Sequence, residues 1–178
     1  MNIPNLLTLS RIILIPIFVY FLLLNVPYGD YLAGLVFAIA ALTDSLDGYL
    51  ARRWEQVTKF GMVVDPLADK LLVTAALISL VELNRIAGWI AIIIIGREFA
   101  VTGLRIIKAE EGVIIPASSL GKLKTITQII ALLLVIVPGI YRPYVAVDLG
   151  MWCMYIAVVI TVVSGIDYFY QSYKTSRT

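Results

Sequence analysis

Six long apolar segments fill most of this 178-residue chain, and only short breaks separate them. They cover residues 12–26, 31–50, 60–83, 86–107, 120–138 and 143–170. A helix that crosses the hydrocarbon of a bilayer needs about 20 apolar residues. The first segment is short, but a helix there could extend back through residues 5–11. The pattern predicts an all-α integral membrane protein with six transmembrane helices in a single domain, residues 1–178.

The composition excludes several classes of protein. Hydrophobic residues make up 61% of the chain and charged residues 15%, against about 45–50% and about 25% in soluble domains. The chain has no His, the usual general base near neutral pH and the commonest metal ligand. Its single cysteine, Cys153, rules out an internal disulfide. A net charge of +2 is too small to favour nucleic-acid binding.

The basic residues predict an orientation. With six spans and both termini on one side, only Arg85 and Arg142 of the 14 Lys and Arg residues lie on the opposite side. Because Lys and Arg accumulate in cytoplasmic loops, the side with the termini is expected to be cytoplasmic. Four aspartates fall on that side. The expectation is a multi-pass membrane protein whose polar site faces the cytoplasm.

These four aspartates lie at or inside apolar segments, where ionisable side chains are costly and usually functional. At about 100° per residue, each of two helices places its aspartates and small residues on one face. The first set is Asp44, Asp47, Gly48 and Ala51, and the second is Gly61, Asp65 and Asp69. Pro66 predicts a helix start or a kink beside Asp65.

Four carboxylates around one space repel each other unless they are protonated or bind cations. Ligands that are all oxygen favour a hard ion, Mg²⁺ or Mn²⁺, and two divalent cations would balance the charge. A paired-metal site suits displacement at phosphorus, and a carboxylate at its edge could accept a proton from an attacking hydroxyl. A single Asp could equally pair with Lys or Arg for folding, but four in two helix-spaced pairs favour a site.

The run D-x2-D-G-x2-A-R-x8-G-x3-D-x3-D, from Asp44 to Asp69, resembles the signature of the CDP-alcohol phosphotransferases. The resemblance implies six helices around a polar cavity open to the cytoplasm, paired as a homodimer. It also implies one metal on Asp44, Asp47 and Asp65, a second on Asp44, Asp65 and Asp69, and Asp69 as the base. The residues that it places near the CDP-lipid are Gly48, Ala51, Arg52, Thr58 and Gly61, with Asn5 and Thr8 as weaker candidates.

The acceptor has to be inferred from the fourth and fifth segments. Arg97, Arg105, Lys122 and Lys124 are expected near the cytoplasmic helix ends, where they suit a phosphate on the acceptor. On charge alone they could equally anchor the helix ends and pair with Glu98, Glu110 or Glu111. The stretches "MNIPNLLTLSRI", "GREFAVTGLR" and "GKLKT" resemble the bacterial phosphatidylglycerophosphate synthases. That resemblance implies CDP-diacylglycerol and glycerol 3-phosphate as substrates, CMP as a product and the bacterial inner (cytoplasmic) membrane as the location.

Three other functions stay open at this point. A phosphotransferase of the same family could use serine, inositol phosphate or phosphatidylglycerol as its acceptor. An intramembrane prenyltransferase also has Asp pairs like Asp65 and Asp69, but the small residues and Arg52 have no counterpart there. A cation transporter would distribute its carboxylates across the membrane depth, whereas these gather on one side.

Overall fold

The computed structural model of the chain describes residues 3–24, 26–53, 59–111 and 119–175, and it shows no β-strand in these ranges. Each predicted apolar segment matches one α-helix, so the all-helical prediction is confirmed. The helices are α1 (Ile3–Leu23), α2 (Gly29–Arg53), α3 (Lys59–Glu82), α4 (Gly88–Glu110), α5 (Ser119–Ile136) and α6 (Leu149–Thr175), with a 3-10 helix η1 (Pro138–Ile140) after α5.

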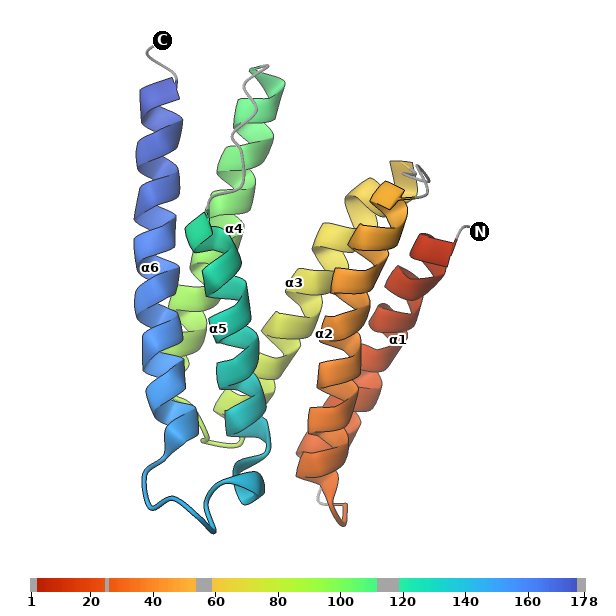
Figure 1. The fold of residues 1–178 in the computed structure, drawn as a ribbon, viewed down its shortest axis with the longest axis vertical. Helices are drawn as coiled ribbons and strands as arrows, with labels where there is room; N and C mark the ends of the chain where they lie inside the picture. The colour runs from red at the N-terminus through yellow and green to blue at the C-terminus, as the bar shows by residue number, and fades with distance from the viewer. Residues whose placement is uncertain (1–2, 25, 54–58, 112–118, 176–178) are drawn as a thin grey trace.

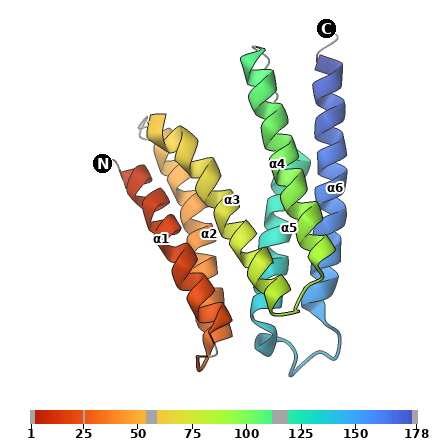
Figure 2. The same cartoon turned by 180° about the vertical axis from the view of Figure 1, so that it is seen from behind.

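The helices form two groups of three, α1–α3 and α4–α6 (Figure 1). They alternate in direction, so both termini lie at one end of the bundle, which we call the terminal end (Figures 1 and 2). The α1–α2, α3–α4 and α5–α6 connections lie at the other end, the loop end. The two groups come together toward the loop end through α3 and diverge toward the terminal end.

The α3–α4 connection reverses the chain in a few residues. Asn84 has a positive φ of 54°, a conformation that Asn tolerates better than most residues. The N–H of Arg85 donates to the carbonyl of Leu80 at 2.9 Å, and the N–H of Asn84 donates to that of Val81 at 2.9 Å. This is the Schellman pattern, which satisfies carbonyls that the helix end leaves unpaired. The turn therefore brings α3 and α4 together as antiparallel neighbours.

One helix begins later than its apolar segment, and another begins before the proline in its sequence. The last apolar segment was expected to begin at residue 143, but α6 begins at Leu149, because the Asp148 carboxylate accepts the N–H of Met151 at 3.1 Å and caps the helix. Pro66 does not start a helix, since α3 runs continuously from Lys59. It is the eighth residue of α3, so its missing N–H removes one hydrogen bond inside the helix, and the kink that the sequence allowed there stays a prediction.

Arg85 joins three elements at the loop end. Its Nη2 donates to both carboxylate oxygens of Asp30, in the first turn of α2, at 2.8 and 2.9 Å. Its Nη1 donates to the carbonyl of Ile136, the last residue of α5, at 3.0 Å. Each contact also suits a helix dipole, with an anion at the start of α2 and a cation at the end of α5. One side chain thus links the two groups of helices.

The interior of the bundle is apolar, and so is much of its surface. The rings of Phe18 and Phe37, both fully buried, lie 5.6 Å apart between α1 and α2. Large apolar side chains are exposed on all six helices, among them Ile13, Leu35, Ile78, Ile92, Ile126 and Val159. Water-soluble monomers rarely expose apolar surface on this scale.

Length and apolar composition identify one helix able to cross a bilayer by itself within the described parts of the chain. It covers Leu149–Lys174 in α6. Two shorter apolar stretches, Leu9–Leu23 and Gly29–Thr43, lie in α1 and α2. Six membrane crossings remain a prediction.

Candidate functional site

The two aspartate pairs occupy two helices that follow each other in the chain, α2 and α3. Asp44 and Asp47 lie in the last turns of α2, while Asp65 and Asp69 lie in the first half of α3. The two helices are antiparallel and in contact, so both pairs lie toward the terminal end of the bundle. The four side chains are outside what the structure describes. The helical spacing expected from the sequence is therefore present, and the ligand roles stay predictions.

The residues expected near the CDP-lipid follow the same distribution. Asn5 and Thr8 lie in the first turns of α1, and Gly61 lies in the first turn of α3. Gly48, Ala51 and Arg52 lie in the last turns of α2. Their side chains, like all of Thr58, fall outside the described residues. α1 contacts both α2 and α3, so the backbone collects the nucleotide candidates at one end of three mutually contacting helices.

The described side chains include no group of three or more acidic or cysteine side chains able to hold a metal. The donor set that fits a metal is instead the four aspartates. They offer only carboxylate oxygens from two adjacent helices, which is the chemistry that Mg²⁺ and Mn²⁺ prefer. Two divalent cations remain a prediction on this basis.

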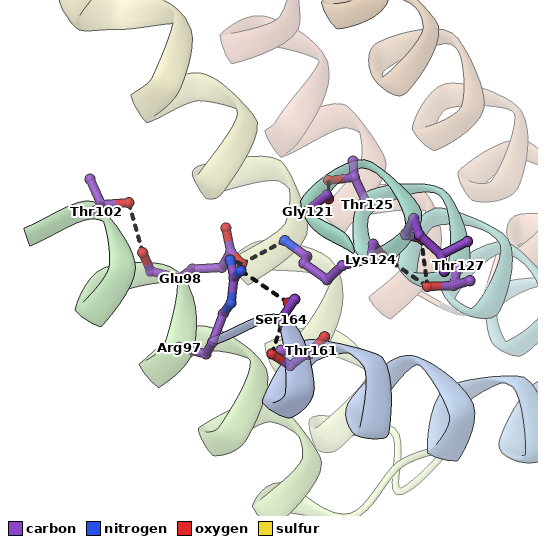
Figure 3. Close-up of polar contacts among 10 residues, drawn as sticks. Arg97, Glu98, Thr102, Gly121, Lys124, Thr125, Thr127, Thr161 and Ser164 are labelled. Atoms are coloured by element: carbon purple, nitrogen blue, oxygen red, sulfur yellow. Dashed lines mark hydrogen bonds and ion pairs between the residues drawn. The ribbon is translucent and has the colours of Figure 1, made fainter. Parts of the chain in front are cut away.

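Two of the four cations predicted to bind the acceptor meet at Glu98 on α4 (Figure 3). The Glu98 carboxylate accepts a hydrogen bond from Lys124 Nζ at 2.5 Å and another from Arg97 Nη1 at 3.0 Å. All three side chains are mostly buried, with 17%, 8% and 15% exposure for Glu98, Lys124 and Arg97. Charges this buried interact strongly, so the cluster fixes α4 against α5.

Arg97 also fixes α4 against α6. Its Nη2 donates to the hydroxyl of Ser164 at 3.0 Å, and that hydroxyl donates in turn to the carbonyl of Thr161 at 3.0 Å (Figure 3). The stem of Arg97 passes over Gly165, where a Cβ would lie 3.1 Å from Arg97 Cγ. A small residue at 165 is therefore what lets a bulky cation lie between the two helices.

The other two predicted cations lie apart from this cluster. Arg105 and Lys122 are exposed. On the last turn of α4, Lys108 pairs with Glu111 at 2.6 Å, as expected for helix-end anchoring. Pairing with Glu98, the alternative to an acceptor site, is thus present for Arg97 and Lys124. Such pairing leaves an acceptor role open, because a paired cation still has other donors.

A cavity of about 60 Å³ lies between α3, α4 and α5, beside the Glu98 cluster. Its polar lining comes from Lys70, Thr74, Glu98, Lys124, Thr125 and Gln128. Lys70 directly follows Asp69 in sequence, which places the cavity next to the aspartate helix. Gln128 was not among the predicted site residues. The signal in the sequence was its position four residues after Lys124, on the same face of the helix.

Comparison with known proteins gives consistent matches. Residues 1–163 match the family model described as CDP-alcohol phosphatidyltransferase. A protein of Bacillus subtilis (strain 168) named CDP-diacylglycerol–glycerol-3-phosphate 3-phosphatidyltransferase is 46% identical over 192 aligned residues, covering 99% of this chain and 98% of the relative.

Relatives with the same name occur in other bacteria. One from Shigella flexneri serotype 5b (strain 8401) is 42% identical, covering 94% of this chain and 92% of its own length. One from Rickettsia bellii (strain RML369-C) is 38% identical, covering 94% of this chain and 93% of its own length.

Proposed function

Because the chain belongs to the CDP-alcohol phosphatidyltransferase family, we propose that it transfers the phosphatidyl group of CDP-diacylglycerol to sn-glycerol 3-phosphate. The products are phosphatidylglycerophosphate and CMP. The observation that carries the proposal is the complete aspartate signature on two adjacent antiparallel helices. Full-length similarity to three relatives that carry this activity in their names selects the acceptor.

The reaction takes place at the cytoplasmic face of the bacterial inner membrane, in a bundle that crosses the bilayer six times. Exposed aromatic side chains on α6 support the crossing, with Trp152 near one end and Tyr170 near the other. At 1.5 Å per residue they lie about 27 Å apart along the helix, close to the roughly 30 Å of the hydrocarbon core. Aromatic residues accumulate at both membrane–water interfaces.

The metals are two Mg²⁺ or Mn²⁺ ions. Asp44, Asp47 and Asp65 would hold one, and Asp44, Asp65 and Asp69 the other. When bound, such a pair polarises a phosphoryl group and stabilises a leaving oxygen. Without His, a carboxylate is the available base, and Asp69 takes the proton of the glycerol 1-hydroxyl. That oxygen attacks the phosphorus that bears diacylglycerol. The bond between this phosphorus and the CMP oxygen breaks, and CMP departs.

The acceptor phosphate binds at the Arg97 and Lys124 end of the site, with the exposed Arg105 and Lys122 as further donors. Buried guanidinium and ammonium groups bind phosphate strongly because little water competes. Glu98 keeps both cations in place before the acceptor arrives. Following the resemblance to the family, the protein works as a homodimer, and some of the exposed apolar side chains form the interface.

The test is CMP release by the purified protein in detergent with CDP-diacylglycerol and Mg²⁺ or Mn²⁺. Release with glycerol 3-phosphate, but not with serine, inositol phosphate or phosphatidylglycerol, is expected, and EDTA should abolish it. Asp69→Asn should lose nearly all turnover while it keeps the wild-type unfolding temperature. Release with another acceptor would retain the aspartate chemistry and reject the acceptor assignment. No release with any acceptor from folded protein would favour a prenyltransferase or a transporter.

A further inference from the structure

The cavity between α3, α4 and α5 contains a buried polar atom that has no partner. Gln128 is 2% exposed and lines the cavity, and its Oε1 makes no hydrogen bond to any described residue. A buried hydrogen-bond acceptor without a partner is destabilising. The position of this oxygen is explained if a hydrogen-bond donor from a bound substrate occupies the cavity during the reaction.

The cavity also lies between the helix that carries Asp69 and the helix that carries Lys124. Val73, which lines the cavity, is one helical turn beyond Asp69 on the same face of α3. One turn corresponds to about 6 Å along the axis. On the opposite side, Lys124 and Gln128 are one turn apart on one face of α5. Lys70, the neighbour of Asp69, and Lys124 both line the cavity, so an acceptor that reaches from Lys124 toward Asp69 would lie beside it.

We propose that Gln128 is a specificity-determining residue, whose Oε1 accepts a hydrogen bond from the secondary hydroxyl of the acceptor, on the carbon between the phosphate-bearing and the reacting carbons. This inference rests on the proposed function and deepens it by assigning the recognition of one substrate group. The space of about 60 Å³ is enough for a hydroxyl together with a few water molecules. A neutral amide suits a hydroxyl, while the cations beside it suit the phosphate.

The experiment compares glycerol 3-phosphate with 3-hydroxypropyl phosphate, which lacks the secondary hydroxyl but keeps the phosphate and the reacting hydroxyl. The wild type should use the analogue with a kcat/KM about 10- to 100-fold lower, because Gln128 is then left without a donor. In Gln128→Leu, kcat/KM for glycerol 3-phosphate should fall by a similar factor while that for the analogue stays the same or rises. The ratio of kcat/KM for glycerol 3-phosphate to kcat/KM for the analogue should therefore approach one in this variant. The KM for CDP-diacylglycerol should be unchanged.

Two controls keep the result specific. Gln171→Leu makes the same substitution on α6, where the Gln171 amide already donates to Asp167 at 2.8 Å, and it should leave the ratio at the wild-type value. Because Gln128→Leu removes an unsatisfied buried group, the unfolding temperature should be unchanged or higher. If Gln128→Leu does not fold, Gln128→Met, of similar volume and unbranched, takes its place in the same comparison.

The outcomes separate this inference from the function on which it rests. A wild type that releases CMP with glycerol 3-phosphate, together with an unchanged ratio in Gln128→Leu, overturns the role of Gln128 and leaves the function standing. In that case the cavity holds water only. An equal change of the ratio in Gln171→Leu also overturns it. A wild type that releases no CMP with either acceptor overturns both.

Discussion

Replacing Glu98 by Gln removes the carboxylate that two buried cations share. Lys124 lies 2.5 Å and Arg97 3.0 Å from the same oxygen of Glu98, and Lys124 is only 8% exposed. After the substitution, the Lys124 ammonium keeps at most a neutral amide as its partner. Arg97 retains the Ser164 hydroxyl at 3.0 Å, so it is less affected.

The size of the effect follows from burial. Removing one partner of a buried ion pair costs about 3–5 kcal/mol, because the remaining charge is left without compensation. The Gln amide oxygen can still accept one hydrogen bond, which places the expected loss at the lower end, about 3 kcal/mol. For a chain of this size, that corresponds to a fall in Tm of roughly 6–12 °C.

The assay is unfolding of the purified protein in one detergent, followed by circular dichroism. Glu110→Gln is the matched control, since Glu110 is exposed on the same helix and should change stability by less than about 0.5 kcal/mol. Adding Lys124→Met to Glu98→Gln should recover part of the loss, because the unpaired ammonium is then gone. A Glu98→Gln protein as stable as the Glu110→Gln control would refute the reasoning that this cluster holds α4 against α5.

Three further predictions concern the rest of the bundle. In the same unfolding assay, Arg85→Met should lower stability by about 2 kcal/mol. The loss is smaller than for a fully buried pair because Arg85 and Asp30 are both partly exposed. Gly34→Ala should destabilise the protein, since a Cβ there would collide with the side chain of Val137. Gly103 has open space around it, so Gly103→Ala should leave the free energy of unfolding unchanged or raise it by up to about 1 kcal/mol. Equal effects of the two substitutions would contradict the packing. Burial alone would raise the pKa of the Asp148 carboxyl, but hydrogen bonds from a tyrosine hydroxyl, a backbone N–H and an arginine outweigh it and hold the pKa below the ordinary 3.8. Its carboxylate therefore stabilises the fold above about pH 4, and this stabilisation is lost as pH falls through the lower pKa of the folded state. The Tm difference between wild type and Asp148→Asn should shrink between about pH 4 and pH 2. A Tm difference constant across this range would contradict the lowered pKa.

Local helix chemistry explains why the sequence predicted the six helices well and the start of α6 poorly. An apolar run long enough to form a buried or lipid-facing helix is a property of consecutive residues, so six runs predicted six helices. Where a helix begins depends on which group satisfies its first N–H groups. Asp148 does so for α6, and the apolar residues before it, from Pro143 onward, could not reveal that the helix starts later.

The sequence alone predicts most of the candidate aspartate site. Asp44 and Asp47, like Asp65 and Asp69, share a helical face by their spacing alone, and a short connection makes the two helices antiparallel neighbours. The charge chemistry then follows from the residue types, because four carboxylates without His or Cys favour hard cations. For this reason the reaction class could be predicted before any fold was known.

Only the tertiary structure decided how the basic residues divide. Arg97, Arg105, Lys122 and Lys124 look equivalent in sequence, yet packing buries two of them around Glu98 and leaves two exposed. The contacts of Arg97 and Lys124 join α4 to α6 and α5, and helix-to-helix distances are not encoded in the spacing along one helix. The same holds for Gln128, whose isolation depends on which side chains three separate helices bring to one cavity.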